Sequence, residues 1–225
     1  MEASLFTAIR PLESIGGDSL SRQYYRLRKH VFHDVLAWDV IAKNNQEIDE
    51  YDALSPLYVA WCSDDLQQLY GGVRLLPTDG PTLLRDVFQK TCPAEAMPCD
   101  AAIFEATRMC VDERVIEERF DGMKPARAIS LMLAALCECG LAIGAKSMVS
   151  NFEAPMRRVY RRAGLEPKIL GHADGYGKRP VYCGQFDINS DLLKAIRASL
   201  GLDFPIFVHL PTVLKAARPL NDMAA

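Results

Sequence analysis

Apolar side chains recur along the chain with two periods, one typical of helices and the other of strands. In the first helical stretch, Leu20, Tyr24, Leu27 and Val31 follow the 3.6-residue spacing that places them on one face. Similar spacing elsewhere, helped by a proline near the first turn of the long central segment, predicts helices over residues 18–36, 81–88, 124–144, 155–163 and 190–200.

Shorter apolar runs, some alternating with polar positions, predict strands over residues 5–9, 57–62, 69–76, 101–111, 146–150, 166–172 and 179–187. The first strands follow one another as hairpins, and the later ones alternate with helices. This order predicts an α/β fold, a three-layer α/β/α sandwich around a mixed central sheet. We expect one domain over residues 1–225, with a loosely packed tail over residues 203–225.

Two local patterns refine this prediction. Residues 43–52 are polar and acidic. Trp38 precedes them and Tyr51 lies near their end, which predicts an ordered loop. Ser150-Asn151-Phe152-Glu153 resembles a capping box for the helix that begins at Pro155, and Gly164 predicts the end of that helix.

Composition and charge argue against several classes of protein. A net charge of -3 argues against general affinity for nucleic acid or an anionic membrane. The seven cysteines form no CxxC pair, and the four histidines lack metal-ligand spacing, so we expect neither a metal nor a cofactor. The N-terminal residues show no export signal, and Glu138 interrupts the longest apolar run. We therefore expect a cytoplasmic protein with reduced thiols.

Arg28 is the first residue that the fold alone does not explain, because it falls within the apolar stripe of the first helix. An inward-facing guanidinium is costly unless carboxylates meet it. Acidic and basic residues that fit such a cluster follow at Glu47, Asp49, Asp52, Arg74, Glu105 and Arg108. The pattern leaves two interpretations open, a polar functional cleft and a set of separate structural ion pairs.

Four segments, LRKHVFHDVLAWDV, EIDEYD, YGGVRLLPTDGPTLLRDVF and FEATRMCVDE, resemble the acyl-homoserine-lactone synthases, the autoinducer synthases of bacterial quorum sensing. The chain supplies every member of that family's pattern in order: Arg28, Phe32, Trp38, Asp49, Asp52, Arg74, Phe88, Glu105 and Arg108. A full pattern in register is far more specific than an isolated RLLP. The resemblance implies a fold similar to that of N-acetyltransferases, which agrees with the predicted sandwich.

The resemblance also implies a reaction. Enzymes of that family acylate the amine of S-adenosylmethionine from an acyl thioester, close the product to an N-acyl-homoserine lactone and release methylthioadenosine, and we expect the same of this chain. Phe32 and Trp38 suit the sulfonium, because an aromatic face attracts a cation within about 6 Å, and Arg28 or Arg108 suits the carboxylate. The residues expected to bind S-adenosylmethionine are Arg28, Phe32, Trp38, Asp49, Asp52, Thr107 and Arg108.

Glu105 is the expected general base, since the substrate amine must lose a proton before it attacks. Arg74 and Phe88 are expected to shape the cleft. In a regular strand Glu105 and Arg108 point to opposite faces, so their joint use requires a bulge, which we predict between Ala106 and Arg108. Backbone amides at this bulge are the expected oxyanion site.

The helix predicted over residues 155–163 carries four arginines on one side: Arg157, Arg158, Arg161 and Arg162. A charge run on a helix is often only a solvated face, but this one has no intervening acid, and acyl carrier protein is acidic. We therefore expect carrier docking there, with coenzyme A as the alternative donor. By resemblance, Ser147 and Met148 are expected in the acyl-chain pocket, and Ser147 favours a chain oxygenated at its third carbon. The segments ATRMC, ALCECGL and ADGYGK resemble a branch of the family with long-chain products.

Two other functions compete with this one. An acetyl-coenzyme A-dependent N-acetyltransferase normally has the phosphate-binding pattern [RQ]xxGx[GA] after its central strand. Here that stretch is DERVIEERFDGMKPAR, with Gly122 as its one glycine, which disfavours such an enzyme. A noncatalytic binding module is disfavoured by the intact set from Arg28 to Arg108.

Overall fold

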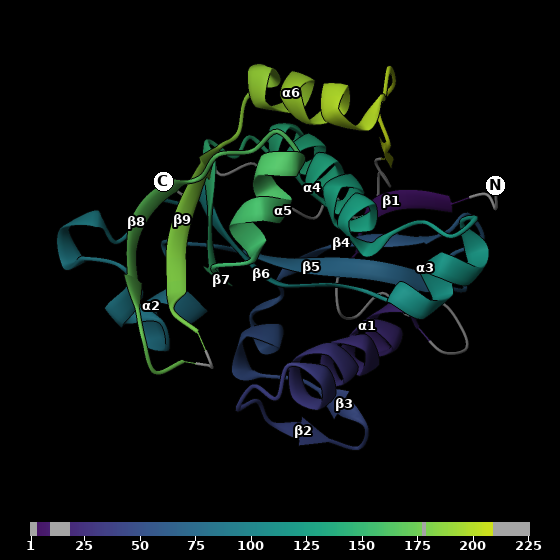
Figure 1. The fold of residues 1–225 in the computed structure, drawn as a ribbon. Helices are drawn as coiled ribbons and strands as arrows, with labels where there is room; N and C mark the ends of the chain where they lie inside the picture. Colours follow the sequence, from purple (N-terminus) through teal and green to yellow (C-terminus); the bar gives the residue numbers. More distant parts are fainter. Residues whose placement is uncertain (1–3, 10–18, 177–178, 209–225) are drawn as a thin grey trace, which may run out of the picture.

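The computed structural model describes residues 4–9, 19–176 and 179–208. An eight-stranded mixed sheet forms the middle layer, in the order β10-β1-β4-β5-β6-β7-β9-β8 (Figure 1). The pairs β6–β7 and β1–β10 are parallel, and the other neighbours are antiparallel. The strands are β1 Ser4–Ile9, β4 Leu57–Ser63, β5 Leu69–Pro77, β6 Ile103–Val111, β7 Ser147–Glu153, β8 Lys168–Ala173, β9 Val181–Asp187 and β10 Phe207–Val208.

Helices cover both faces of this sheet, which confirms the predicted three layers. In Figure 1, α1 lies below the sheet and α4, α5 and α6 lie above it. Along β4, Val59 and Trp61 belong to the core between the sheet and α4, whereas Tyr58 and Ala60 belong to the core between the sheet and α1. The helices are α1 Leu20–Arg28, α2 Leu83–Asp86, α3 Glu113–Arg119, α4 Pro125–Ala142, α5 Met156–Arg162 and α6 Ser190–Leu200.

The long helix α4 lies in the core of the fold. Among the described helices, it alone is long and apolar enough to cross a membrane, yet 67% of its span is buried inside the protein. It begins with Pro125 in its first turn, as the sequence predicts. Its buried residues, such as Met132 and Leu136, belong to the larger hydrophobic core.

Three local predictions need correction. The first helix reaches its predicted length, but its second half, Lys29–Val35, is a π-helix, and Val35 is exposed. The predicted capping box is wrong, because β7 continues through Glu153 and no side chain caps α5. The helix α3 was not predicted; Asp112 caps its first turn by accepting from the Val115 amide.

The acidic loop has more structure than expected. Two short strands, β2 Ala42–Lys43 and β3 Gln46–Glu47, form a hairpin, and a 3₁₀ helix over Glu50–Leu54 follows. Asp49 and Asp52 cap the start of this 3₁₀ helix reciprocally. The hairpin and the caps together hold Glu47, Asp49 and Asp52 in fixed places.

The segment after α6 is attached to the core at residues 206–207. Glu138 in α4 accepts from the amides of Ile206 at 2.9 Å and Phe207 at 2.7 Å, and it pairs with Arg197. Phe207 is buried, and β10 pairs with β1. Loose packing of the tail therefore does not extend to residues 206–207, and residues 209–225 lie outside the described part.

Candidate active site

The central strands β6 and β7 separate in the middle of the sheet. They pair only where Ile103, Phe104 and Glu105 meet Ser147, Met148 and Val149. At the point of separation, Ser150 Oγ donates to the Ala106 carbonyl at 2.8 Å. Farther along, β6 remains paired with β5 and β7 with β9. Such a splayed pair leaves backbone groups of both strands available to a ligand.

A bulge in β6 lies just past this separation. Gly72 of β5 pairs with Cys110 and Arg74 with Thr107, so Arg108 and Met109 together oppose the single residue Val73. Arg108 adopts a left-handed conformation with φ 57°, and Tyr24 Oη donates to its carbonyl at 2.8 Å. The predicted bulge is therefore present, at residues 108–109 rather than between 106 and 108. It re-aims the strand, as bulges beside active sites do.

Three arginines and three carboxylates form one cluster between α1, β5, β6 and the acidic segment: Arg28, Arg74, Arg108, Glu47, Asp49 and Asp52. Arg28 donates to both oxygens of Asp52, at 2.8 and 2.9 Å, and also to Glu47. Arg74 binds Asp49 and Asp52. The formal charges cancel, which removes much of the cost of burying six ionised groups.

The arginines of the cluster lower the pKa of two of its carboxyl groups, Asp52 and Glu47. Burial alone would raise the pKa of Asp52, but the hydrogen bonds and charge of Arg28 and the charge of Arg74 outweigh it and hold that pKa well below its usual range. Burial would also raise the pKa of Glu47, but the charges of Arg28 and Arg108 outweigh burial and lower that pKa. Glu47, which the sequence indicates only as a partner for Arg28, thus bridges two arginines.

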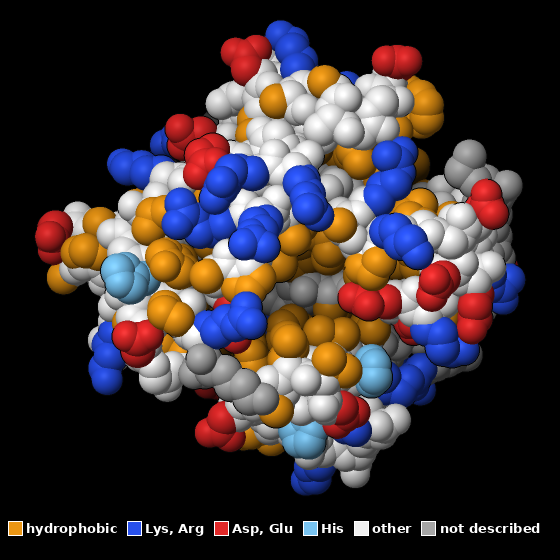
Figure 2. Space-filling view, in the orientation of Figure 1, with side chains coloured by type: hydrophobic (Ala, Val, Ile, Leu, Met, Phe, Trp, Pro, Cys, Tyr) orange, Lys and Arg blue, Asp and Glu red, His pale blue; other side chains and the backbone are white. Residues whose placement is uncertain are grey.

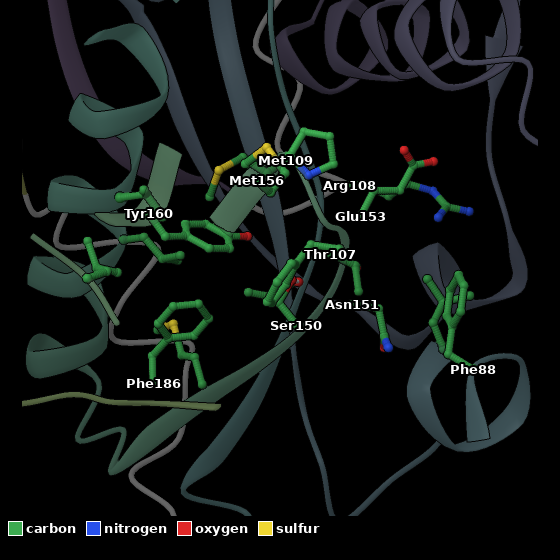
Figure 3. Close-up of a pocket in the computed structure, with 18 of the residues that line it drawn as sticks. Phe88, Thr107, Arg108, Met109, Ser150, Asn151, Glu153, Met156, Tyr160 and Phe186 are labelled. Atoms are coloured by element: carbon green, nitrogen blue, oxygen red, sulfur yellow. The ribbon is translucent and has the colours of Figure 1, made fainter. Parts of the chain in front are cut away.

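A cavity of about 550 Å³ adjoins this cluster and reaches both faces of the sheet. On the α1 side, Phe32, Trp38, Phe88 and Arg108 line it, and on the α4 side its walls are mainly apolar (Figure 2). Figure 3 shows the two sides, with Tyr160 and Phe186 opposite Phe88 and with Thr107 and Ser150 between them. The separation of β6 and β7 joins the two sides.

The sequence-predicted residues fall into two groups. Those that line the cavity are Phe32, Trp38, Phe88, Thr107, Arg108 and Met148. Those behind its wall are Arg28, Asp49, Asp52, Arg74, Glu105 and Ser147, none of which lines the cavity as the described residues enclose it. Arg28 is fully buried, and the rings of Tyr24 and Tyr25 flank its guanidinium. Of the two arginines expected at a substrate carboxylate, only Arg108 therefore reaches the cavity.

Phe32 and Trp38 form one aromatic wall. Their ring centroids lie 5.2 Å apart, and the Arg108 guanidinium carbon lies 5.4 Å from the Phe32 centroid. The π-helix places Phe32 in this position, and Trp38 follows it, with the Trp38 amide donating to the Phe32 carbonyl. An aromatic pair beside a guanidinium suits a ligand that carries both a cation and a carboxylate.

Glu105 is buried on the α1 side of β6, where its carboxylate accepts from the amides of Leu83, at 3.0 Å, and Leu84 at the start of α2. Burial raises the pKa of Glu105 to about 7, and the two amide hydrogen bonds oppose this shift. The carboxyl group therefore exchanges a proton near neutral pH, from a site just behind the cavity wall.

Ser147 points away from the cavity, and Gln185 Nε2 donates to its hydroxyl at 2.8 Å. Successive residues of a strand face opposite sides, so Met148 lines the cavity and Ser147 does not. The hydroxyls that do line it are those of Thr107, Ser150 and Tyr160. The alternation of β7 could have identified Ser150, whereas Tyr160 depends on how α5 packs.

The four arginines of α5 are not equivalent. Arg158, Arg161 and Arg162 are exposed, whereas Arg157 is half-buried with its guanidinium carbon 5.6 Å from the Tyr182 ring centroid. Figure 2 shows basic side chains gathered along the rim of the hollow on the side where α5 lies. Among the described residues no cluster of His, Cys, Asp and Glu has the arrangement of a metal site.

Comparison with known proteins identifies the family. The family model of the autoinducer synthases matches residues 15–196. The chain belongs to the autoinducer synthase family. An acyl-homoserine-lactone synthase from Rhizobium etli is 32% identical over 181 residues, 79% of this chain and 82% of the relative. The protein is therefore an enzyme, an acyltransferase of this family.

Solved structures identify the fold. The autoinducer synthase fold of this chain resembles that of BjaI, a CoA-dependent acyl-homoserine lactone synthase solved with SAM and isopentyl-CoA, with a TM-score of 0.75 at 24% identity over 95% of this chain and 99% of that chain. An N-acetyltransferase from Lactobacillus plantarum matches with a TM-score of 0.51 at 16% identity, covering 84% of this chain and 100% of that chain. The expected likeness to the N-acetyltransferase fold is thus confirmed.

Proposed function

We propose that this enzyme acylates the amine of S-adenosylmethionine from an acyl thioester and closes the product to an N-acyl-L-homoserine lactone. The observation that carries the proposal is the cavity between β6 and β7, with an arginine and an aromatic pair on one side and apolar walls on the other. Such a cavity suits two unlike substrates that meet in the plane of the sheet. The curated relatives named acyl-homoserine-lactone synthase support the same reaction.

The α1 side takes S-adenosylmethionine. Arg108 binds its carboxylate, while Phe32 and Trp38 contact its sulfonium. Arg28, Arg74 and the three carboxylates hold Arg108 and the acidic segment in place without touching the substrate themselves. BjaI was solved with SAM, and another relative by structure, TofI, was solved with an inhibitor and MTA.

Glu105 accepts the proton of the amine, through a water molecule or a small movement of α2, because it lies just behind the wall. The neutral amine attacks the thioester carbonyl, and amides freed by the bulge and by the separated strands stabilise the oxyanion. When the tetrahedral adduct collapses, its carbon–sulfur bond breaks, the amide forms, and the departing thiolate takes up the proton that Glu105 received from the amine. The substrate carboxylate then displaces the sulfonium. That step closes the lactone and releases methylthioadenosine, and it requires mainly a folded substrate conformation.

The α4 side takes the acyl chain, and the donor is an acyl carrier protein. The exposed arginines of α5 suit an acidic carrier, whose acyl arm would enter between α5 and β7. Coenzyme A is the alternative donor, since BjaI is described as CoA-dependent.

The test is a reconstituted assay. Purified enzyme with S-adenosylmethionine and a series of acyl carrier protein and coenzyme A thioesters should release an N-acyl-homoserine lactone and methylthioadenosine, detected by mass spectrometry. Absence of lactone with every donor would reject the proposal. Acetylation of unrelated amines with acetyl-coenzyme A would point instead to a general N-acetyltransferase.

A further inference from the structure

Asn151 lies on β7 just past the point where this strand leaves β6. Because β7 alternates, Asn151 shares the face of Val149, which pairs with Glu105, and it lies on the opposite face from Met148, Ser150 and Phe152. It lines the cavity. In Figure 3 its side chain extends toward Phe88, away from Tyr160 and Phe186. Asn151 therefore belongs to the side of the cavity with Thr107 and Arg108.

The hydrogen bonds of Thr91 determine which atom of the Asn151 side-chain amide is the nitrogen and which is the oxygen. The Thr91 hydroxyl donates to the Phe88 carbonyl at 2.7 Å. With its hydrogen committed there, this hydroxyl can only accept from Asn151, and Asn151 Nδ2 donates to it at 2.7 Å. Thr91 is completely buried, so the arrangement is rigid. The Asn151 oxygen, Oδ1, is thus held as an acceptor.

Among the described residues no donor reaches Asn151 Oδ1, although this atom is shielded from solvent. A buried acceptor without a partner costs about 1–3 kcal/mol, and such groups in native proteins call for an explanation. A ligand N–H would remove this cost if a small turn of the Asn151 side chain brings its oxygen to the surface of the cavity that this residue lines. The proposed substrates offer three kinds of N–H donor: the amino-acid amine of S-adenosylmethionine, its adenine amino group, and the amides of the donor's pantetheine arm. The first is the strongest, because it carries a charge when protonated.

We propose that Asn151 is a positioning residue for the attacking amine: its Oδ1 accepts one N–H of S-adenosylmethionine and turns the amine toward the thioester carbonyl. This inference rests on the proposed function and adds to it a residue outside the motif set from Arg28 to Arg108. A neutral amine has two N–H groups and a lone pair. With one N–H on Asn151, and the other available to Glu105 or a water, the lone pair is left for the carbonyl.

The amide of the donor's pantetheine arm is the competing partner, and the position of Asn151 favours the amine. In the proposed function the apolar chain and its arm lie against the face of β7 that carries Met148, Ser150 and Phe152. Asn151 points to the face with Glu105 and Thr107. The two partners predict different kinetic effects, so one experiment separates them.

The experiment compares binding of S-adenosylmethionine with binding of methylthioadenosine, which has the same adenosine and sulfur but neither amine nor carboxylate. Asn151→Leu keeps the volume and removes the acceptor. By calorimetry, its affinity for S-adenosylmethionine should fall about tenfold or more, as expected for a hydrogen bond to a charged group, with methylthioadenosine affinity unchanged. Asn151→Asp keeps an acceptor and should retain both affinities. Gln185→Leu, which removes an amide from the neighbouring strand β9 outside the cavity, should match wild type.

Three outcomes overturn the inference. Equal loss of affinity for both ligands would indicate a merely structural role. Unchanged S-adenosylmethionine affinity with a raised KM for the acyl donor would assign Asn151 to the pantetheine arm. Wild-type behaviour of Asn151→Leu would remove any role. Each presupposes that the wild-type enzyme binds S-adenosylmethionine and forms lactone; if it does neither, the proposed function fails instead.

Discussion

Glu105 and Asp52 are both buried carboxylates on the α1 side of the sheet, yet their surroundings move their pKa values in opposite directions. Asp52 meets the guanidinium groups of Arg28 and Arg74, and their charge keeps it ionised. Glu105 meets two neutral amides, and burial raises its pKa to about 7. The difference in pKa gives the two groups different roles: Asp52 is a structural anion, and Glu105 is a proton acceptor.

The Glu105 pKa predicts the pH dependence of turnover. A general base works only when deprotonated, so kcat should rise as the pH increases through about 7 and level off above it. Glu105→Gln should retain S-adenosylmethionine binding and lower kcat by about 10²–10⁴-fold, with loss of the rising limb. Stopped-flow or steady-state assays from pH 5.5 to about 9 would measure this. Wild-type turnover in Glu105→Gln would exclude Glu105 as the base.

Asp52 predicts a pH dependence of the free energy of unfolding rather than of turnover. Its folded-state pKa is depressed, so its contribution to the free energy of unfolding is present above the unfolded-state pKa of about 4 and is lost as the pH falls below that value. Asp52→Asn leaves Arg28 and Arg74 short of a buried partner and should lower the free energy of unfolding by about 3–5 kcal/mol.

Urea denaturation at pH 7 would measure the effect of Asp52→Asn. The matched control is Asp191→Asn, whose pair with Lys194 is exposed and which should leave the denaturation midpoint unchanged. Equal midpoints for Asp52→Asn and wild type would show that the cluster contributes no net stability.

At this scale the sequence predicts which residues matter better than it predicts what they touch. The inward position of Arg28 follows from helical spacing, and the nearby carboxylates indicate its partners. That Arg28 lies behind the wall while Arg108 lines the cavity does not follow from spacing, because it depends on a positive φ at Arg108. The fixed amide of Asn151 depends in turn on the hydroxyl of Thr91, sixty residues earlier.

At the scale of elements, the bulge in β6 and the helix α1 depend on each other. Tyr24 of α1 donates to the Arg108 carbonyl, and its ring lies against Gly72, the residue of β5 that precedes the bulge. A Cβ at Gly72 would lie 2.8 Å from a ring carbon of Tyr24. No side chain fits there, so glycine sets how closely α1 approaches the sheet.

Gly72→Ala should therefore displace Tyr24 and loosen the bulge. We expect a loss of about 1–3 kcal/mol in the free energy of unfolding, as for other overpacked sites, and a fall in kcat, because Arg108 loses the bond that fixes its carbonyl. Gly80→Ala is the control, since nothing lies within 4 Å of its added Cβ. Thermal denaturation and turnover would be measured on both; a fully stable and active Gly72→Ala would show that α1 can shift without effect on the site.

Elements with a clear period were predicted well, whereas those set by capping or by tertiary contacts were not. The extent of α6 and of the paired strands β4 and β5 follows from apolar periodicity. The helix α3 has Asp112 as an N-cap but only Ile116 fully buried, so its apolar stripe is too short to detect. The pattern at Ser150 resembled a cap because Ser and Glu also occur in strands, and only the pairing with β9 distinguishes the two.

At the scale of the whole molecule, the layered sheet explains how one cavity serves two unlike substrates. Both faces of the sheet are covered, so a ligand cannot cross it except where two strands part, and β6 and β7 part beside the bulge. The charged cluster then lies on one side and the apolar core of α4 on the other. The sequence predicts the layers, but not the path through them.

The distribution of charge over the surface gives the last prediction. The protein is acidic overall, with a net charge of -3, yet three arginines of α5 are exposed. Figure 2 shows basic side chains along the rim of the hollow on the side where α5 lies. A basic patch on an acidic protein attracts an acidic partner to one place, mainly by raising the association rate, and salt screens the attraction.

Arg158→Glu with Arg161→Glu should therefore raise the KM for an acyl carrier protein thioester several-fold while leaving that for S-adenosylmethionine unchanged. Lys194→Glu, on α6 away from the cavity lining, is the matched charge reversal. The effect should shrink as salt is added. An unchanged KM for the carrier thioester would remove α5 from the docking surface, and the arginines would then be a solvated helix face.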